Sequence, residues 1–127
     1  GGPFLGPDGW LYLTDARRGF RITRREGDTL EGKGARIWRV RPDGTGLESI
    51  AGGGFDNAIE IAFLPSGDTV GTMTYVVEPR DGVRDALMHW VEGGVYPKPH
   101  EVIAADRLTL TGDYLTPMTM LARVAPS

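Results

Sequence analysis

Histidine is the side chain most often used for acid–base chemistry and metal binding near neutral pH, so the two histidines of this 127-residue sequence are the first candidates. The separation of His89 and His100 matches neither a helical metal pair nor the His-x-Glu-x-x-His pattern of zinc sites. His89 also stands among apolar residues, which is typical of a histidine that packs in the fold and forms a hydrogen bond. The sequence therefore favours structural roles for both.

Other patterns that carry chemistry are missing from the sequence. The serines at positions 49, 66 and 127 do not stand in a Gly-x-Ser-x-Gly nucleophile elbow, and there is no cysteine to act as a nucleophile or thiolate ligand. The segment 43–46 lacks the Asp-x-Asp-x-Asp series of a calcium loop. The glycines at 32, 34 and 52–54 lack the strand and helix that flank a nucleotide-binding loop. These segments are predicted to be turns and loops.

The densest charged segment holds five arginines, at positions 17, 18, 21, 24 and 25. A phosphate-binding surface would use such a cluster. However, acidic residues follow directly at 26, 28 and 31, and the chain carries a formal net charge of −3. We therefore expect a solvated insertion loop over residues 15–34 and no nucleic-acid partner.

Two further segments could present polar side chains to a ligand. Asn57 precedes the apolar segment 59–63, and residues 80–98 combine charges, a pair of glycines and Tyr96 in a long connection. A local role is the alternative for Asn57, because asparagine side chains commonly bond the neighbouring backbone in turns. Both interpretations stay open from the residues alone.

The elements that must position these residues are predicted to be short strands. Nineteen glycines and nine prolines rule out long helices, while 40% apolar and 24% charged residues are ordinary for a folded domain. Residues 84–92 could form a short helix or a strand. No apolar run reaches the ~18 residues that span a bilayer, so we expect no membrane insertion. Strands are predicted at 10–14, 36–41, 47–51, 59–63, 70–77, 108–111 and 119–124.

A repeat organises these strands. Phe4–Tyr12 and Ala62–Val70 each contain an apolar strand end, a Pro-x-Gly turn and a second strand. The spacing between Pro7 and Pro65 exceeds the ~40–45 residues of a propeller blade, and the insertion at 15–34 accounts for the excess. The copies begin near residues 5 and 63, and a third could begin near residue 120.

The strand at 10–14 is apolar on both faces, whereas a sandwich strand normally keeps one face in water. Stacked propeller blades bury both faces of their inner strands. We therefore predict an all-β chain: a partial six-bladed β-propeller of about two to three antiparallel four-stranded blades. Residues 1–127 would form a single fragment of that domain, and we expect them to belong to a longer polypeptide.

Two segments resemble the soluble PQQ-dependent glucose/sorbosone dehydrogenases. Residues 84–99, with Trp-Val-Glu-Gly-Gly-Val-Tyr-Pro at 90–97, are similar to a family signature in which an acidic segment leads into Gly-Gly-Asn-Tyr-Gly-Trp-Pro. Residues 54–63 are similar to the family's Gly-x-Arg-Asn-Pro-x-Gly-Leu-Ala-Phe. Residues 18–46 look still more like the membrane-bound dehydrogenase domain proteins of planctomycete-type bacteria, which are large secreted proteins often followed by a c-type haem domain.

The resemblance implies a six-bladed propeller that holds pyrroloquinoline quinone (PQQ) and calcium on its axis. It implies oxidation of a small-molecule sugar or alcohol by hydride transfer, in a periplasmic or other extracytoplasmic compartment, with a c-type haem domain as partner. Asn57 matches the family's cofactor-proximal asparagine, and Arg80 and Asp81 match a pair whose backbone carbonyls hold the cofactor-bound calcium. Tyr96 matches a residue whose backbone would help to hold a second calcium ion. We expect the family's catalytic histidine outside this segment.

Two positions depart from the family's pattern. Asp56 stands where an arginine would polarise the quinone, and Ala86 stands where a glutamate would bind the second calcium. Two alternatives to the dehydrogenase therefore stay open. One is a non-catalytic propeller that binds glycans or proteins. The other is a calcium-dependent, lactonase-like hydrolase that would use Asn57 and Glu60.

Overall fold

A computed structural model of the chain describes most of the first two thirds of the sequence and one later strand. Within these residues it contains ten β-strands and no helix, so the prediction of an all-β chain is confirmed. The strands form two four-stranded sheets and one two-stranded sheet, and every pairing is antiparallel. No helix in this part of the chain could cross a membrane. The described residues are 1–16, 18–32, 35–52, 57–76, 83–94, 96 and 118–123.

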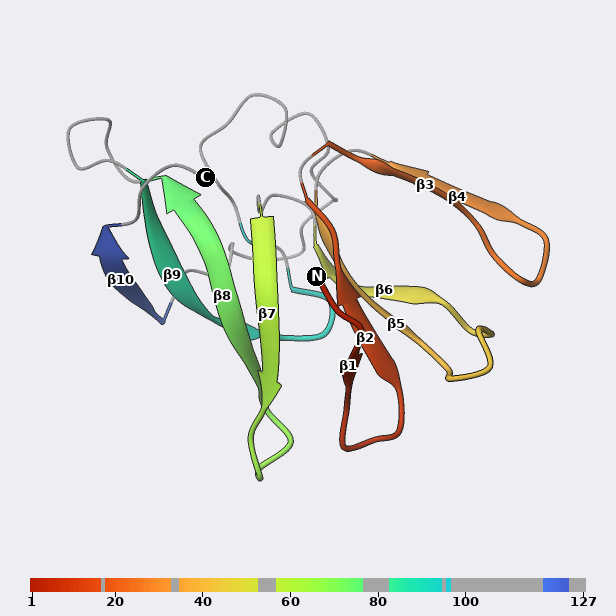
Figure 1. Cartoon of the computed structure of the whole chain (residues 1–127), viewed down its shortest axis with the longest axis horizontal. Coiled ribbons are helices and arrows are strands. Elements are labelled where there is room, and N and C mark those ends of the chain that lie inside the picture. The colour runs from red at the N-terminus through yellow and green to blue at the C-terminus, as the bar shows by residue number, and fades with distance from the viewer. Residues whose placement is uncertain are drawn as a thin grey trace.

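The first sheet has the order β1-β2-β5-β6. Its strands are β1 (Phe4–Leu5), β2 (Leu11–Thr14), β5 (Arg36–Val40) and β6 (Glu48–Gly52). The predicted hairpin between 36–41 and 47–51 is confirmed, because β5 pairs directly with β6. β6 therefore forms one edge of this sheet (Figure 1).

The second sheet follows the order of the chain, with each strand pairing with the next. Its strands are β7 (Asn57–Phe63), β8 (Thr69–Val76), β9 (Val83–Trp90) and β10 (Thr119–Arg123). The segment 84–92, for which the sequence left helix and strand open, is strand β9 over most of its length.

Residues 119–123, near which a third copy of the repeat could have begun, form β10 and complete the second sheet. The strand predicted at 108–111 lies outside the described residues.

Both sheets connect their first two strands through the same kind of turn. In the first, the Gly6 N–H donates to the Trp10 carbonyl oxygen (2.8 Å) and the Gly9 N–H to that of Gly6 (3.0 Å). In the second, the Leu64 N–H donates to the Asp68 carbonyl oxygen and the Gly67 N–H to the Leu64 carbonyl oxygen, both at 2.9 Å. Gly9 and Gly67 have φ angles of 83° and 92°, which residues other than glycine rarely adopt. The two sequence copies thus occupy the same place in two sheets.

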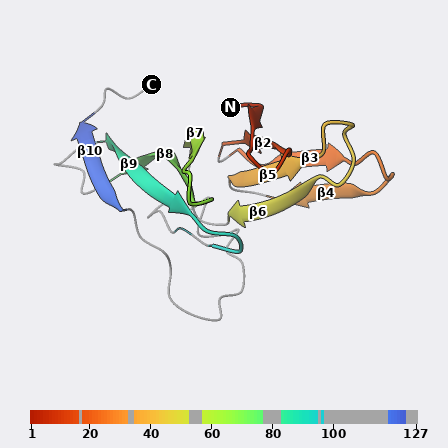
Figure 2. The same cartoon turned by 90° about the horizontal axis from the view of Figure 1, so that it is seen from below.

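The segment 15–34 is an insertion, but it is not the irregular loop that the sequence predicted. β3 (Phe20–Thr23) and β4 (Thr29–Gly32) form a two-stranded hairpin, while β2 and β5 on either side pair with each other. The turn closes because Gly27 adopts a φ of 103° and its N–H donates to the Arg24 carbonyl oxygen at 2.9 Å. Figure 1 and Figure 2 both show the hairpin on the side of the first sheet that faces away from β7–β10.

The core lies between the two four-stranded sheets. Tyr12 of β2 meets Phe63 of β7 edge to face, with ring centroids 4.9 Å apart. On β5, Ile37 is buried in this core, whereas Trp38 is buried against Phe20 of the hairpin. β5 is therefore covered on both faces, on one by the core and on the other by the hairpin. The strand for which the sequence predicted two covered faces is β2, where Tyr12 is buried but Leu11 and Leu13, on the other face, are only half-buried. The other buried core residues are Ala35, Ala51, Ala58, Ile61, Met73, Ala86, Met88, Trp90 and Tyr96.

Candidate functional site

The residues matched to the quinone site begin at one end of β7. Asn57 is the first residue of this strand, and its register partner on β8 is Thr74. Thr74 in turn pairs with Asp85 of β9, so three polar residues form one row across the sheet. Glu60 lies further along β7 in an exposed position. Asp56, Arg80 and Asp81 lie outside the described residues.

Ala86, which the resemblance aligns with a calcium-binding glutamate, lies in the core. It is fully buried on β9, opposite Met73 of β8. A methyl group supplies no ligand atom, and an unpaired carboxylate at this place would carry a desolvation cost of several kcal/mol. The described residues at this position therefore do not fit a calcium site.

Tyr96 lies beside the end of β9, and its hydroxyl is already engaged. It accepts a hydrogen bond from the Val91 N–H and donates one to the His89 carbonyl oxygen, both at 2.7 Å. Its ring meets Trp90 edge to face at 5.1 Å, and the side chain is 1% exposed. Burial raises the pKa of the phenol, more than the Val91 N–H lowers it, so the hydroxyl stays a donor. The structure thus gives Tyr96 a role in organising a turn.

His89 forms a hydrogen bond, as the sequence predicted, but outside the core. Its Nε2 lies 3.2 Å from an oxygen of Asp68, and both side chains are about half exposed. The Ser66 hydroxyl donates to the other oxygen of Asp68 at 2.7 Å, and these two bonds lower the pKa of Asp68. The carboxylate stands between serine and histidine, so His89 is not placed to activate Ser66. His100 lies outside the described residues.

No group of three or more His, Cys, Asp or Glu side chains that could hold a metal ion occurs in the described part of the chain. Two carboxylates on the described part of the second sheet, those of Asp85 and Glu60, are in separate environments. Asp85 accepts a long hydrogen bond of 3.5 Å from the Thr74 hydroxyl, and Glu60 is exposed on β7. This part of the chain offers no preformed cation cage.

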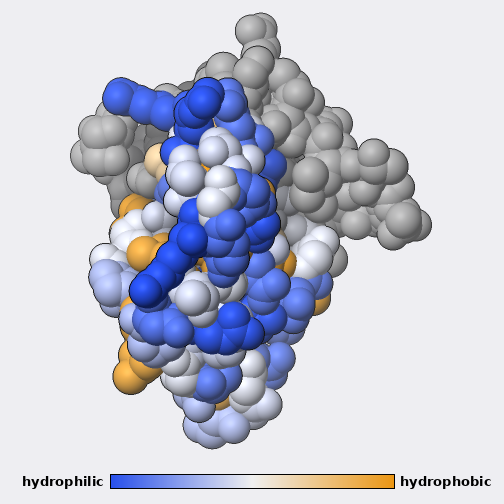
Figure 3. All heavy atoms as spheres, turned by 90° about the vertical axis from the view of Figure 1, so that its right-hand side faces the viewer, coloured by the Kyte–Doolittle hydropathy of each residue, from blue (hydrophilic) through white to orange (hydrophobic). Residues whose placement is uncertain are grey.

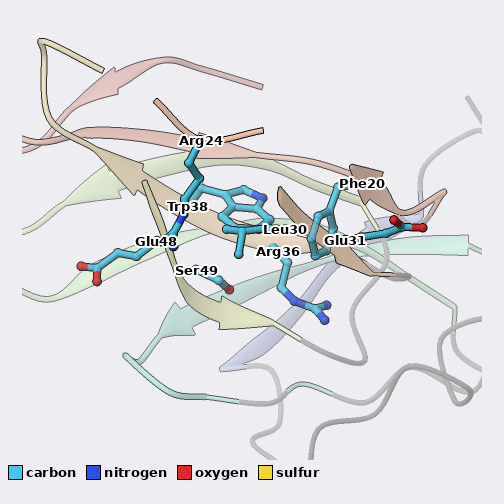
Figure 4. A pocket seen from close by; sticks show the side chains of 8 residues that line it. All are labelled: Phe20, Arg24, Leu30, Glu31, Arg36, Trp38, Glu48 and Ser49. Carbon is cyan, nitrogen blue, oxygen red and sulfur yellow. The ribbon is translucent and has the colours of Figure 1, made fainter. Parts of the chain in front are cut away.

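The inserted hairpin creates a groove between itself and the first sheet (Figure 4). The groove has a volume of about 290 Å³. Figure 4 shows the rings of Phe20 and Trp38 and the side chain of Leu30 gathered at the centre of the groove, while the carboxylates of Glu31 and Glu48 point away from the rings. Arg24, Arg36 and Ser49 complete the lining. The centre of the groove is therefore apolar and its rim is charged.

The floor of the groove is held by contacts among residues far apart in the sequence. Phe20 and Trp38 meet edge to face at 4.8 Å, and the Arg36 guanidinium lies 5.3 Å from the centroid of the Phe20 ring. Asp15 accepts hydrogen bonds from the Arg36 N–H (2.6 Å) and the Trp38 indole N–H (3.2 Å). Burial nevertheless raises the pKa of Asp15, because loss of hydration outweighs these bonds.

The charges around the groove are largely paired. Arg24 binds Asp28 through its Nε at 2.7 Å, and Arg39 binds Glu48 at 2.6 Å. Further along the hairpin, Arg21 forms an exposed ion pair with Glu31 at 3.1 Å. Figure 3, which views this side of the molecule, shows a mostly hydrophilic surface with scattered hydrophobic residues. The prediction of a solvated charged segment is confirmed for the arginines at 18, 21 and 25, which are exposed, whereas Arg24 is half-buried at the groove.

Sequence reasoning missed this groove. The sequence predicts a solvated insertion loop that contains Asp15 and Phe20, and it singles out neither residue. The available signal was the alternation of apolar and charged residues at 20–23 and 29–32, which is typical of strands with one covered face.

Comparison of the chain with family models, with curated proteins and with solved structures finds no match.

Proposed function

We propose that the chain forms two neighbouring blades of a β-propeller in a dehydrogenase-like protein that oxidises a sugar or alcohol outside the cytoplasm. One observation supports this proposal most. Two four-stranded antiparallel sheets open with the same strand, Pro-x-Gly turn and strand, and they pack against each other through β2 and β7. Propellers are built from four-stranded sheets of this kind, stacked around a common axis.

In this proposal the cofactor site lies at the start of β7. Asn57 would hydrogen-bond the quinone, and the backbone carbonyls of Arg80 and Asp81 would hold its calcium ion. The quinone supplies the hydride acceptor, which no side chain of the chain can provide. The sheet would position Asn57 for this contact, because pairing with Thr74 fixes the backbone of Asn57. The fit does not extend to the second calcium position, where Ala86 is buried in the core.

The test is reconstitution of the full-length protein with PQQ and calcium, followed by dye reduction on a panel of sugars and alcohols. We expect turnover, and a loss of about tenfold or more in Asn57→Ala, since one hydrogen bond to a charged group contributes about 1.5–3 kcal/mol. Glu60→Gln, exposed on the same strand, is the control and should keep its activity. Absence of turnover on the whole panel would overturn the proposal, and lactone hydrolysis without added quinone would select the hydrolase instead.

A second candidate, a propeller that binds glycans without catalysis, is favoured by the groove beside the hairpin. Sugar rings bind through their apolar C–H faces and their hydroxyls, and the groove offers the half-buried Phe20 ring with Glu31 and Ser49 at its rim. Titration calorimetry with oligosaccharides tests this candidate. Phe20→Ala should weaken binding about tenfold, whereas Leu5→Ala, an exposed substitution on β1, should leave it unchanged.

A further inference from the structure

The segment that carries the Trp-Val-Glu-Gly-Gly-Val-Tyr string connects the two four-stranded sheets. The Gly93 N–H donates to the Ile50 carbonyl oxygen at 2.6 Å, and the Gly52 N–H donates to the Gly94 carbonyl oxygen at 3.1 Å. Ile50 and Gly52 belong to β6, the edge strand of the first sheet, whereas residues 91–94 follow β9 of the second. The turn after β9 therefore supplies one donor and one acceptor to the edge of the other sheet.

Tyr96 holds this turn in shape from the inside. Its hydroxyl donates a hydrogen bond to the carbonyl oxygen of His89, which precedes the turn, and accepts one from the N–H of Val91, with which the turn begins. The Gly94 N–H closes the turn by donating to the Val91 carbonyl oxygen at 2.8 Å. A side chain at Gly94 would place its Cβ 2.7 Å from the Tyr96 hydroxyl and 2.8 Å from the Val91 carbonyl oxygen. The hydroxyl thus occupies space that only a glycine leaves open.

Trp90 anchors the same turn to the core. It is 4% exposed and packs against Tyr96 edge to face. Gly71, on the neighbouring strand β8, makes room for it, because a Cβ at this position would collide with the Trp90 indole nitrogen. Because Trp90 is fixed in the core and the turn is bonded to β6, the end of β9 is held in place relative to β6.

We infer that Trp90, Gly93, Gly94 and Tyr96 form a metal-independent clasp between the sheets, in the segment where the resemblance implies a second calcium site. Calcium requires six to eight oxygen ligands. Here the position of the carboxylate ligand is the buried methyl group of Ala86, and the Tyr96 hydroxyl already makes two hydrogen bonds at 1% exposure. The inference rests on this geometry and does not depend on whether the protein binds a quinone.

The experiment is thermal unfolding and amide hydrogen exchange of the whole chain, either with calcium at about 5 mM, which exceeds the dissociation constants of weak protein sites (up to about 1 mM), or with a chelator. We expect the same Tm in both conditions. Tyr96→Phe should lower the Tm by about 4 °C or more, since it leaves the Val91 N–H without its acceptor. It should also speed exchange of the Gly52 and Gly93 amides, which make the bonds between the sheets.

Tyr12→Phe is the matched control, because the Tyr12 hydroxyl bonds Asp8 within the first sheet at 2.6 Å. It should leave exchange at Gly52 and Gly93 unchanged, which separates the clasp from a general loss of stability. A calcium-dependent rise in Tm that Tyr96→Phe abolishes would overturn the inference. So would unchanged exchange at Gly52 and Gly93 in the Tyr96→Phe variant.

Discussion

The two four-stranded sheets share their topology and their first turn, yet they differ at the connection between the second and third strands. In the first sheet this connection carries the hairpin β3–β4, which covers Trp38 and creates the groove. In the second sheet β8 and β9 are joined through residues 77–82, which lie outside the described residues. The comparison shows that the two sheets share the turn between their first two strands, and that the insertion after the second strand distinguishes the first sheet.

The tryptophans make the sharpest comparison, because each sheet has one buried tryptophan on its third strand. Trp90 belongs to the core and the clasp, and Trp38 to the interface with the hairpin. Trp90→Ala and Trp38→Ala should each lower the free energy of unfolding by about 3–5 kcal/mol, as large-to-small changes in cores do. Chemical denaturation measures this loss. Hydrogen exchange should show that Trp38→Ala loosens β3–β4 first, and equal loosening of both regions would contradict the comparison.

Substitution of Asp15 is expected to give the next largest effect, which is on the pH dependence of the free energy of unfolding. Its pKa is raised by burial, so the folded protein binds the proton more tightly than the unfolded chain does. Ionisation of Asp15 therefore removes stability as the pH rises above its ordinary pKa. Between about pH 4 and 7 the free energy of unfolding should fall more in the native protein than in Asp15→Asn, which cannot titrate.

The pH slope in urea titrations is the measurement for Asp15, because the amide also changes two hydrogen bonds and so shifts the absolute stability. Asp28→Asn serves as the control. Arg24 lowers the pKa of Asp28, so the contribution of this pair to stability is complete above about pH 5 and is lost as the pH falls through the ordinary range of a carboxyl group. Asp28→Asn should therefore leave the slope between about pH 5 and 7 unchanged. An identical slope in Asp15→Asn and the native protein would refute the assigned role of burial.

The smallest effects compare the first turn of each sheet. Asp8 accepts hydrogen bonds from the Trp10 N–H (3.0 Å) and the Tyr12 hydroxyl (2.6 Å), so Asp8→Ala should cost about 1 kcal/mol. Asp68 bonds the exposed Ser66 and His89 side chains instead, and Asp68→Ala should cost less than Asp8→Ala. Thermal unfolding of both variants in parallel decides the order. A larger loss of stability in Asp68→Ala than in Asp8→Ala would contradict this order.

The sequence predicted those features that depend on a few neighbouring residues. The turns at Pro7 and Pro65 were recognisable because proline and glycine restrict the backbone locally. The hairpin β3–β4 was missed because its charged residues concealed the alternation of Phe20 and Ile22 with arginine and threonine. β9 was ambiguous because a short apolar run fits both a strand and a buried helix.

The candidate sites could be predicted only in part, because they depend on pairing between distant segments. Asp15, Phe20 and Trp38 meet only after β2 pairs with β5 and the hairpin folds back. The string ending at Tyr96 was recognisable as a distinctive motif, but its residue types did not reveal that its partners are backbone groups of Val91 and His89. Sequence similarity identifies a segment, whereas the register decides what that segment touches.

The hairpin leaves and rejoins the first sheet between two strands that are direct neighbours. Leu11 to Thr14 pair with Val40 to Ile37 without interruption, so the ends of the inserted segment stay one strand spacing apart whatever lies between them. A hairpin of another length or composition could therefore replace residues 18–32 without changing the pairing of β2 with β5, provided that one of its apolar side chains still covers Trp38 as Phe20 does. The outer surface of the hairpin could then vary while the sheet beneath it is kept.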